Sequence, residues 1–285
     1  MRNILLLLSI VSILSCKEVK GMQEPIKTSN KAPNLIIVLS DQHSYDMVGA
    51  YGNEQIITPN LDKLAREGVV LTNAFSSMPV CTPFRGMLMS GMHPFKNGAF
   101  QNHVPLLPNK TKLLGEILKE KDYQTAYVGK WHIAGGDSNT PVPKDLMYGF
   151  ETVLTYNAFT DFRVGKSFFW NGKDEKEYFK EWEPYAQTNQ VIDYLQHIDK
   201  SKPFAIILSY NPPHNWGRFI GEDGKPHFRY DTLEELTDLY DRDSIKLRPG
   251  LKDTPDRRRM YHTYMAQVSG VDKAFGRLTK HLESM

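Results

Sequence analysis

The sequence predicts an α/β protein with a mostly parallel sheet and helices on both faces of that sheet. Residues 35–39 and 204–208 are short, unbroken apolar runs of the kind found in strands buried on both faces. Segments with helical spacing lie between such runs, so the order along the chain is strand, helix, strand. In sheets of this kind, functional side chains gather beyond the carboxyl ends of the strands.

The composition is that of an ordinary globular protein, and it limits the range of partners. Of 285 residues, 40% are hydrophobic and 24% are charged, which allows a sizeable core. The 35 Lys and Arg residues nearly balance the 33 Asp and Glu residues, giving a net charge of +2. A protein that neutralises a phosphate backbone needs a stronger positive charge, so nucleic acid is not expected as a partner.

Residues 1–16 have the features of an export signal. Arg2 supplies a positive charge, and residues 4–14 form an apolar run too short to cross a bilayer as a mature helix. The run ends at Cys16 in a sequence that resembles a bacterial lipoprotein cleavage box, whose cysteine is lipidated; plain secretion with cleavage nearby is the alternative. Residues 17–32 are polar and suit a flexible tether. We therefore expect an exported lipoprotein, anchored to the membrane by its lipid in the periplasm or at the cell surface.

The first elements after the strand at 35–39 are a helix and a second strand. A helix is expected over residues 58–68, because Thr58 can cap it, Pro59 suits its first turn and Gly68 ends it. A short strand is expected to follow over residues 69–74.

Two further helices and one strand are expected in the rest of the chain. Leucines at helical spacing predict a helix over residues 111–121, and residues 124–128 are strand-like. Near the carboxyl end, apolar residues recur at alternating intervals of four and three. This spacing predicts an amphipathic helix over residues 264–282.

Polar residues follow three of the predicted strands. Asp41 and Gln42 follow the first run, residues 129–132 follow the strand-like segment at 124–128, and residues 211–214 follow the last run. Each of these segments alone is more often a turn than a site. Because the carboxyl ends of parallel strands meet at one edge of a sheet, their coincidence favours a common site.

Cys81 precedes a Pro and a stretch able to form a helix. A cysteine at a helix amino terminus near Arg85 is expected to have a depressed pKa and enhanced reactivity. The alternative is a small buried hydrophobic side chain, which is the usual role of a free cysteine.

Four segments resemble the sulfatases of the alkaline-phosphatase superfamily, and the likeness covers residues 32–285. Residues 81–85 (CTPFR) match the family's Cys-x-Pro-x-Arg core, and residues 33–42 resemble its opening strand with paired metal ligands. Residues 123–132 resemble its second signature, and residues 211–214 its later histidine motif. All four occur in the family's order. Two departures are visible: members commonly have Ser or Ala where Phe84 stands, and often Arg where Met92 stands.

The resemblance implies a modified nucleophile beside a metal ion. A maturation enzyme would oxidise Cys81 to 3-oxoalanine (formylglycine), whose hydrate attacks the sulfur of a sulfate ester. Asp41, the carbonyl of Gln42 and the modified Cys81 would bind Ca²⁺, with Mg²⁺ as the other candidate, because hard oxygen donors suit these cations. Arg85 would hold the hydrated aldehyde.

Three further residues receive roles in handling the sulfate group from the same resemblance. Lys130 would clamp the sulfate oxygens, and His132 would be the base that accepts a proton when the intermediate collapses. His214 would be a sulfate ligand or the acid that protonates the leaving oxygen. The alternatives are a solvated lysine, a capping histidine and a turn histidine.

The expected activity is hydrolysis of sulfate monoesters on a sulfated small molecule or glycan. Family members continue past the helix at 264–282 with a strand that completes the metal site, so residues 33–285 are expected to be a partial, incomplete catalytic domain with poor metal affinity. One alternative is a catalytically impaired protein that binds glycans at the surface or is vestigial. Another is a phosphate ester hydrolase of the superfamily, which Cys81 argues against. The aromatic residues within 159–183 suggest either a sugar platform or core packing.

Overall fold

A computed structural model describes residues 32–285 apart from 108–110, 159–160 and 173–174, and residues 33–285 make up one compact unit. The predicted signal at 1–16 and all but the last residue of the predicted tether at 17–32 lie outside the described residues. Among the helices that are described, none has both the length and the apolar character needed to cross a bilayer.

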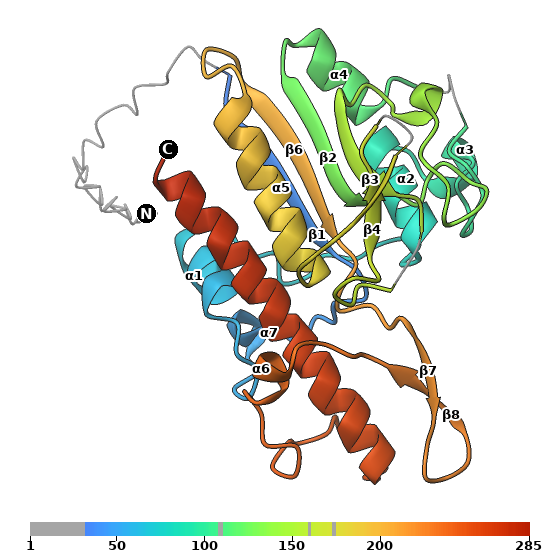
Figure 1. Ribbon diagram of the computed structural model, residues 1–285, viewed down its shortest axis with the longest axis vertical. Coiled ribbons are helices and arrows are strands. Elements are labelled where there is room, and N and C mark those ends of the chain that lie inside the picture. The colour runs from blue at the N-terminus through green and yellow to red at the C-terminus, as the bar shows by residue number, and fades with distance from the viewer. Residues whose placement is uncertain (1–31, 108–110, 159–160, 173–174) are drawn as a thin grey trace, which may run out of the picture. The chain divides into compact units, whose positions relative to one another are not determined.

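The unit is built on a six-stranded sheet with the order β1-β6-β2-β3-β4-β5 (Figure 1). The first four of these strands are parallel and the last two join antiparallel, so the predicted, mostly parallel sheet is confirmed. The strands are β1 (Leu35–Ser40), β6 (Phe204–Tyr210), β2 (Gln124–Lys130), β3 (Thr152–Tyr156), β4 (Phe168–Trp170) and β5 (Lys176–Tyr178).

Helices cover both faces of the sheet, as predicted. Side chains alternate between the faces of a strand, so Val128 and Leu208 point to one face while Tyr127 and Ile207 point to the other. The first pair packs with helices α5 (Glu183–His197) and α7 (Pro255–Glu283), which lie beside each other in Figure 1. The second pair packs with residues of α2 (Cys81–Ser90) and α4 (Leu114–Glu120).

The predicted helices are present, with shifted ends. Thr58 and Gly68 flank α1 (Pro59–Glu67), and Pro59 stands in its first turn. The helix expected over 111–121 is the shorter α4, whereas the one expected over 264–282 is part of the longer α7, which Thr254 caps. The smaller elements are η1 (Gly49–Tyr51), α3 (Pro94–Asn97), η2 (Lys144–Leu146), the hairpin β7 (Gly217–Ile220) and β8 (Pro226–Arg229), and α6 (Glu234–Thr237).

The prediction of a strand over residues 69–74 is wrong. This segment has no strand partner among the described residues, and the side chains of Val69 and Leu71 are 88% and 66% exposed. A run of branched residues forms a strand only where another strand edge accepts its hydrogen bonds. The burial expected for residues 35–39 is also incomplete: β1 pairs with β6 alone within the described chain, and all six of its residues are partly exposed.

Candidate active site

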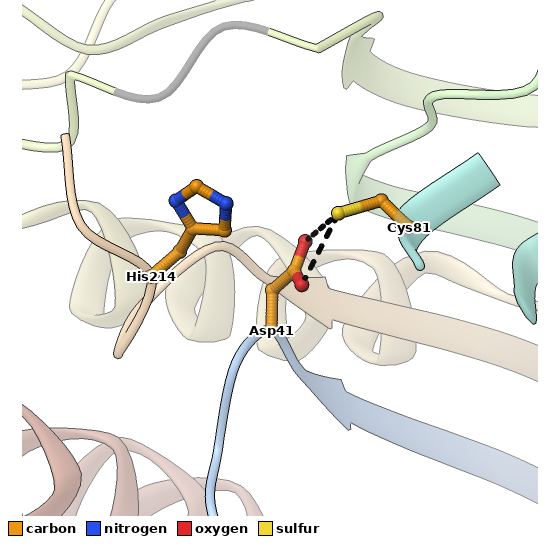
Figure 2. Close-up of side chains that lie close together, drawn as sticks. All are labelled: Asp41, Cys81 and His214. Carbon is orange, nitrogen blue, oxygen red and sulfur yellow. Dashed lines mark hydrogen bonds between the residues drawn. The ribbon is translucent and has the colours of Figure 1, made fainter. Parts of the chain in front are cut away.

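Three strand ends and one helix start bring the predicted site residues together. Asp41 follows β1, Lys130 ends β2, His214 lies in the loop after β6, and Cys81 is the first residue of α2. Figure 2 shows Asp41, Cys81 and His214 facing a common space, and their ligand atoms lie within 4.8 Å of one another. The convergence follows from the parallel sheet, because its carboxyl ends share one edge.

Cys81 is a partly buried thiol that faces the Asp41 carboxylate. Its Sγ lies 3.5 Å from both carboxylate oxygens of Asp41, and the Nζ of Lys130 lies 3.8 Å from it. The expectation of a depressed pKa is wrong. Burial raises the pKa of the Cys81 thiol, Asp41 raises it further, and the nearby Lys130 and Arg85 do not offset these effects.

Asp41 is an ionised carboxylate held between two cations. Its Oδ2 lies 2.7 Å from the Nζ of Lys130 and 3.3 Å from the Nη2 of Arg85. Burial alone would raise the pKa of Asp41, but the two cations hold that pKa well below its usual range. The site therefore keeps a fixed negative charge at neutral pH.

Arg85 is a buried strut that joins α2 to the ends of three strands. Its side chain is only 5% exposed, and Nη1 donates hydrogen bonds to the hydroxyl of Tyr127, the carbonyl of Lys130 and the hydroxyl of Ser209. Because Nη2 contacts Asp41, a single guanidinium fixes the relative positions of β1, β2 and β6.

Lys130 is buried at the centre of the site, with 1% of its side chain exposed. Besides Asp41, its Nζ contacts the side-chain oxygen of Asn211 at 3.4 Å. Asn211 received no role from the sequence, although it is the first residue after β6 and fully buried. Its position directly after a buried strand is the signal that would have identified it.

His132 has an unpartnered ring beside the site. The backbone is not extended at His132, which has a left-handed φ of 57°. Neither ring nitrogen has a hydrogen-bond partner among the described residues, and the ring of His103 lies edge-on at 4.9 Å. Burial, together with the charges of Lys130 and Arg85, lowers the pKa of His132 to about 3, so the ring is neutral.

His214 is oriented by a hydrogen bond to the backbone. Its Nδ1 contacts the carbonyl of Asn215, and because a carbonyl only accepts, Nδ1 carries the proton in the neutral ring. This tautomer leaves Nε2 as the acceptor nitrogen. Burial and the charge of Lys130 lower the pKa of His214 below its ordinary value.

Gln42 lies next to the site and lines a neighbouring cavity. Its backbone carbonyl accepts a hydrogen bond from the Tyr264 hydroxyl at 2.6 Å, and its Oε1 accepts one from the backbone N–H of Asn215 at 3.3 Å. The cavity has a volume of about 600 Å³. Its lining includes Tyr230, Tyr261, Arg248 and Arg257, together with His43.

The described donor set does not by itself fit Ca²⁺ or Mg²⁺. Asp41 is the only carboxylate in the group with Cys81 and His214, and two cations already bind it. Ca²⁺ takes six to eight oxygen ligands, and neither a thiol nor an imidazole is a hard donor. The described residues therefore supply only part of what either cation requires.

The aromatic residues near the site serve mainly in packing. Trp131 is fully buried and packs against Tyr127 at 4.5 Å between ring centroids. Of the aromatic residues within 159–183, Phe168 and Trp182 are buried, whereas Tyr178 is 56% exposed. Core packing therefore accounts for Phe168 and Trp182.

A buried carboxyl lies behind Lys130 at the start of α5. Glu183 is 1% exposed, and Oε1 accepts a 2.6 Å hydrogen bond from the Tyr156 hydroxyl while Oε2 accepts one from Ser167. Burial raises the pKa of Glu183 from 4.5 to about 7, although these hydrogen bonds and Lys130 oppose the shift. The folded protein thus keeps this proton at pH values where the unfolded chain has lost it.

We expect Glu183→Gln to remove part of the pH dependence of stability. The unfolded carboxyl ionises above pH 4.5 and the folded one near pH 7, so the wild type loses roughly 3 kcal/mol relative to the variant as the pH rises through this window. Urea denaturation of both proteins at pH 4.5 and pH 8 measures this difference. Glu67→Gln, at an exposed position, serves as the control and should show no such change. A constant difference between wild type and Glu183→Gln would contradict the assignment.

Comparisons with known proteins point to one family. The family model described as Sulfatase matches residues 33–285. An ulvan-active sulfatase from Formosa agariphila is 31% identical over 282 residues, which cover 96% of this chain and 51% of the relative. An endo-4-O-sulfatase from Bacteroides thetaiotaomicron is 28% identical, with 93% of this chain and 58% of the relative covered.

A solved structure shows the same fold. A protein solved in work on glycosaminoglycan metabolism by Bacteroides thetaiotaomicron superposes with a TM-score of 0.76 at 28% identity. The superposition covers 89% of this chain and 58% of that protein. The chain therefore spans little more than half the length of the relatives that it matches.

Proposed function

Because the chain belongs to the sulfatase family, we propose that it hydrolyses sulfate monoesters at the site formed by Cys81, Asp41, Lys130 and the two histidines. The observation that carries the proposal is the buried Lys130, whose ammonium group lies 2.7 Å from Asp41 and 3.8 Å from the Sγ of Cys81. A cation held in a water-poor space is suited to binding the negatively charged oxygens of a sulfate ester.

Conversion of Cys81 to formylglycine is the second part of the proposal. The raised pKa of the thiol supports it, because a protonated thiol is a poor nucleophile at neutral pH. When Cys81 carries the hydrated aldehyde, that group supplies the oxygen that attacks the sulfur. The position of Cys81 at the start of α2, opposite Asp41, directs this side chain toward the space shown in Figure 2.

The remaining residues hold the sulfate group and move protons. Lys130 contributes the positive charge, and Arg85 keeps Asp41 in place. His132 is neutral and unpartnered, so it can accept a proton, and the negative charge of a bound ester raises its pKa and makes it a better base. The negative charge of a bound ester also raises the pKa of His214, so that Nε2 takes up a proton from solvent, binds the sulfate and can protonate the leaving oxygen.

We propose sulfated glycans as the substrate class, with a sulfated small molecule as the simpler case. The cavity beside Gln42 joins aromatic side chains with Arg248 and Arg257, a combination that suits a sugar carrying negative charge. The relatives whose printed names specify ulvan or a 4-O-sulfate position support the same class. Three further points stay proposals. Ca²⁺ dependence and the action of a maturation enzyme rest on the resemblance. Anchoring through Cys16, in the periplasm or at the cell surface, rests on residues 1–16.

The test begins with the chemical state of Cys81 in protein made in its native host. We expect mass spectrometry of the peptide bearing Cys81 to show loss of sulfur and two hydrogens and gain of one oxygen. The converted protein, supplied with Ca²⁺, should hydrolyse an aryl sulfate, and Cys81→Ala should lower this rate by about 10⁴-fold or more.

Controls separate loss of chemistry from loss of structure. Cys81→Ala should keep the wild-type circular dichroism spectrum, since it removes only a small, partly buried group. His93→Gln alters a histidine that caps α3 outside the site and should leave the rate unchanged. Absence of product from a chain with verified conversion would refute catalysis by this chain.

A further inference from the structure

A second group of metal-ligating side chains lies away from the site already described. Asp223 is in the turn between β7 and β8, His227 is on β8, and Asp256 is in the first turn of α7. One ligand atom from each residue lies within 4.8 Å of the other two. We propose that these three residues bind a zinc-class divalent cation that fastens the β7–β8 hairpin to the start of α7.

The distances are close to those that a metal ion requires. His227 Nε2 is 2.8 Å from Asp223 Oδ1 and 3.7 Å from Asp256 Oδ2. Zinc binds nitrogen and oxygen ligands at about 2.0–2.2 Å in a tetrahedron, which places neighbouring ligand atoms roughly 3.3–3.6 Å apart. Small rotations of the side chains are therefore enough to bring the ligand atoms to these separations. Asp223, whose side chain is 46% exposed, has room to rotate.

The surrounding structure fixes the least exposed ligand. The side chain of Asp256 is 10% exposed, and its Oδ2 accepts a hydrogen bond from the backbone N–H of Glu222 at 2.9 Å. Gly221 makes this approach possible, because a Cβ at this position would lie 2.4 Å from Asp256 Oδ2 and 2.6 Å from the His227 ring. Hydrogen bonds of this kind orient a ligand before the metal arrives.

The donor types and the charge both favour a cation of the zinc class. An imidazole with two carboxylates suits Zn²⁺ better than Ca²⁺ or Mg²⁺, which prefer oxygen ligands alone. The two carboxylates bring negative charge into a small space, which a divalent cation balances. His227 also lines a cavity of about 340 Å³, together with Arg218 and Arg257, so the ion would enter from the exposed Asp223 side rather than through this cavity.

The experiment uses the full 285-residue chain carrying Cys81→Ala, so that the thiol of the first site does not bind the added metal. Calorimetric titration of the metal-free protein with Zn²⁺ should show one site. His227→Gln should weaken that site by about 100-fold or more. The same loss is expected for Asp223→Asn, whose exposed position in a turn makes misfolding a minor concern.

A local measurement reports where the ion binds. Zn²⁺ should slow amide hydrogen exchange at least about tenfold in residues 221–225 and at the start of α7, because opening the hairpin would then require loss of the ion. His197→Gln is the matched control. His197 lies 3.6 Å from the single carboxylate of Asp193 and is 74% exposed, so its replacement should alter neither result.

Several results would overturn the proposal. Zn²⁺ affinity that survives both His227→Gln and Asp223→Asn would place the ion elsewhere. Equal affinity for Ca²⁺ would contradict the donor argument. Protection of the hairpin on acidification, without uptake of metal, would show that His227 binds a proton between the two carboxylates. None of these results depends on sulfate ester hydrolysis, so the zinc site and the proposed activity fail or succeed separately.

Discussion

Gly129→Ala is expected to destabilise the protein by about 4 kcal/mol or more, which is a large part of the 5–15 kcal/mol that stabilises a typical domain. Gly129 lies in β2 between β6 and β3, and its φ is +100°. A Cβ at this position would lie 2.2 Å from the backbone carbonyl oxygen of Ser209 on β6. Backbone in the centre of a sheet cannot move aside without breaking the pairing of β2 with β6.

The effect of Gly129→Ala should reach the site as well, because the next residue is Lys130. Gly52→Ala is the matched control: Gly52 also has a positive φ, of +94°, but a Cβ there would meet nothing within 4 Å. It should cost only about 1–2 kcal/mol, for the left-handed backbone. Urea denaturation of the three proteins measures both values. Similar losses for the two variants would show that steric contact with Ser209 is not the cause.

Arg85→Met is expected to cost about 3–5 kcal/mol, the loss typical of breaking a buried charge network by removing one partner. The substitution keeps the length of the side chain but removes the donors to Tyr127, Ser209, Asp41 and the carbonyl of Lys130. Lys130 then faces Asp41 without the second cation that shares the carboxylate.

The matched control for Arg85→Met is Arg242→Met. Arg242 contacts Asp243 at 3.9 Å, but both side chains are more than half exposed, so this pair is worth at most about 1 kcal/mol. Thermal unfolding and denaturant titrations of both variants provide the comparison. If Arg85→Met were as stable as Arg242→Met, Arg85 would not be the strut that the structure indicates.

The sequence alone was sufficient to predict three of the six strands, β1, β2 and β6, and the edge of the sheet that carries the site, whereas β3, β4 and β5 were not predicted. Unbroken apolar runs identify β1 and β6, and the rule that parallel strands share their carboxyl ends brings Asp41, Lys130 and His214 to one place. These signals are local patterns combined with one general property of the fold. For that reason they can be interpreted without knowledge of any long-range contact.

Other features depend on contacts between distant segments and were not predictable. The depressed pKa expected for Cys81 considered the helix end and Arg85 but omitted burial, which has the larger effect. The strand expected over residues 69–74 has a suitable composition but lacks a partner in the described chain. Asn211 differs in part: its position after β6 can be read from the sequence, but its contact with Lys130 joins residues 81 positions apart.

The position of Arg85 also determines how the site responds to motion. One guanidinium binds groups on β2 and β6, the residue after β1, and α2 itself, so the site exists only while four segments keep their places. Partial openings that leave the central strands paired, such as fraying of the β7–β8 hairpin, do not separate these groups. Unfolding events that separate any two of the central strands destroy the site. The local free energy of opening at the site should therefore approach the value for global unfolding, and its amides should be among the slowest in the protein to exchange with solvent.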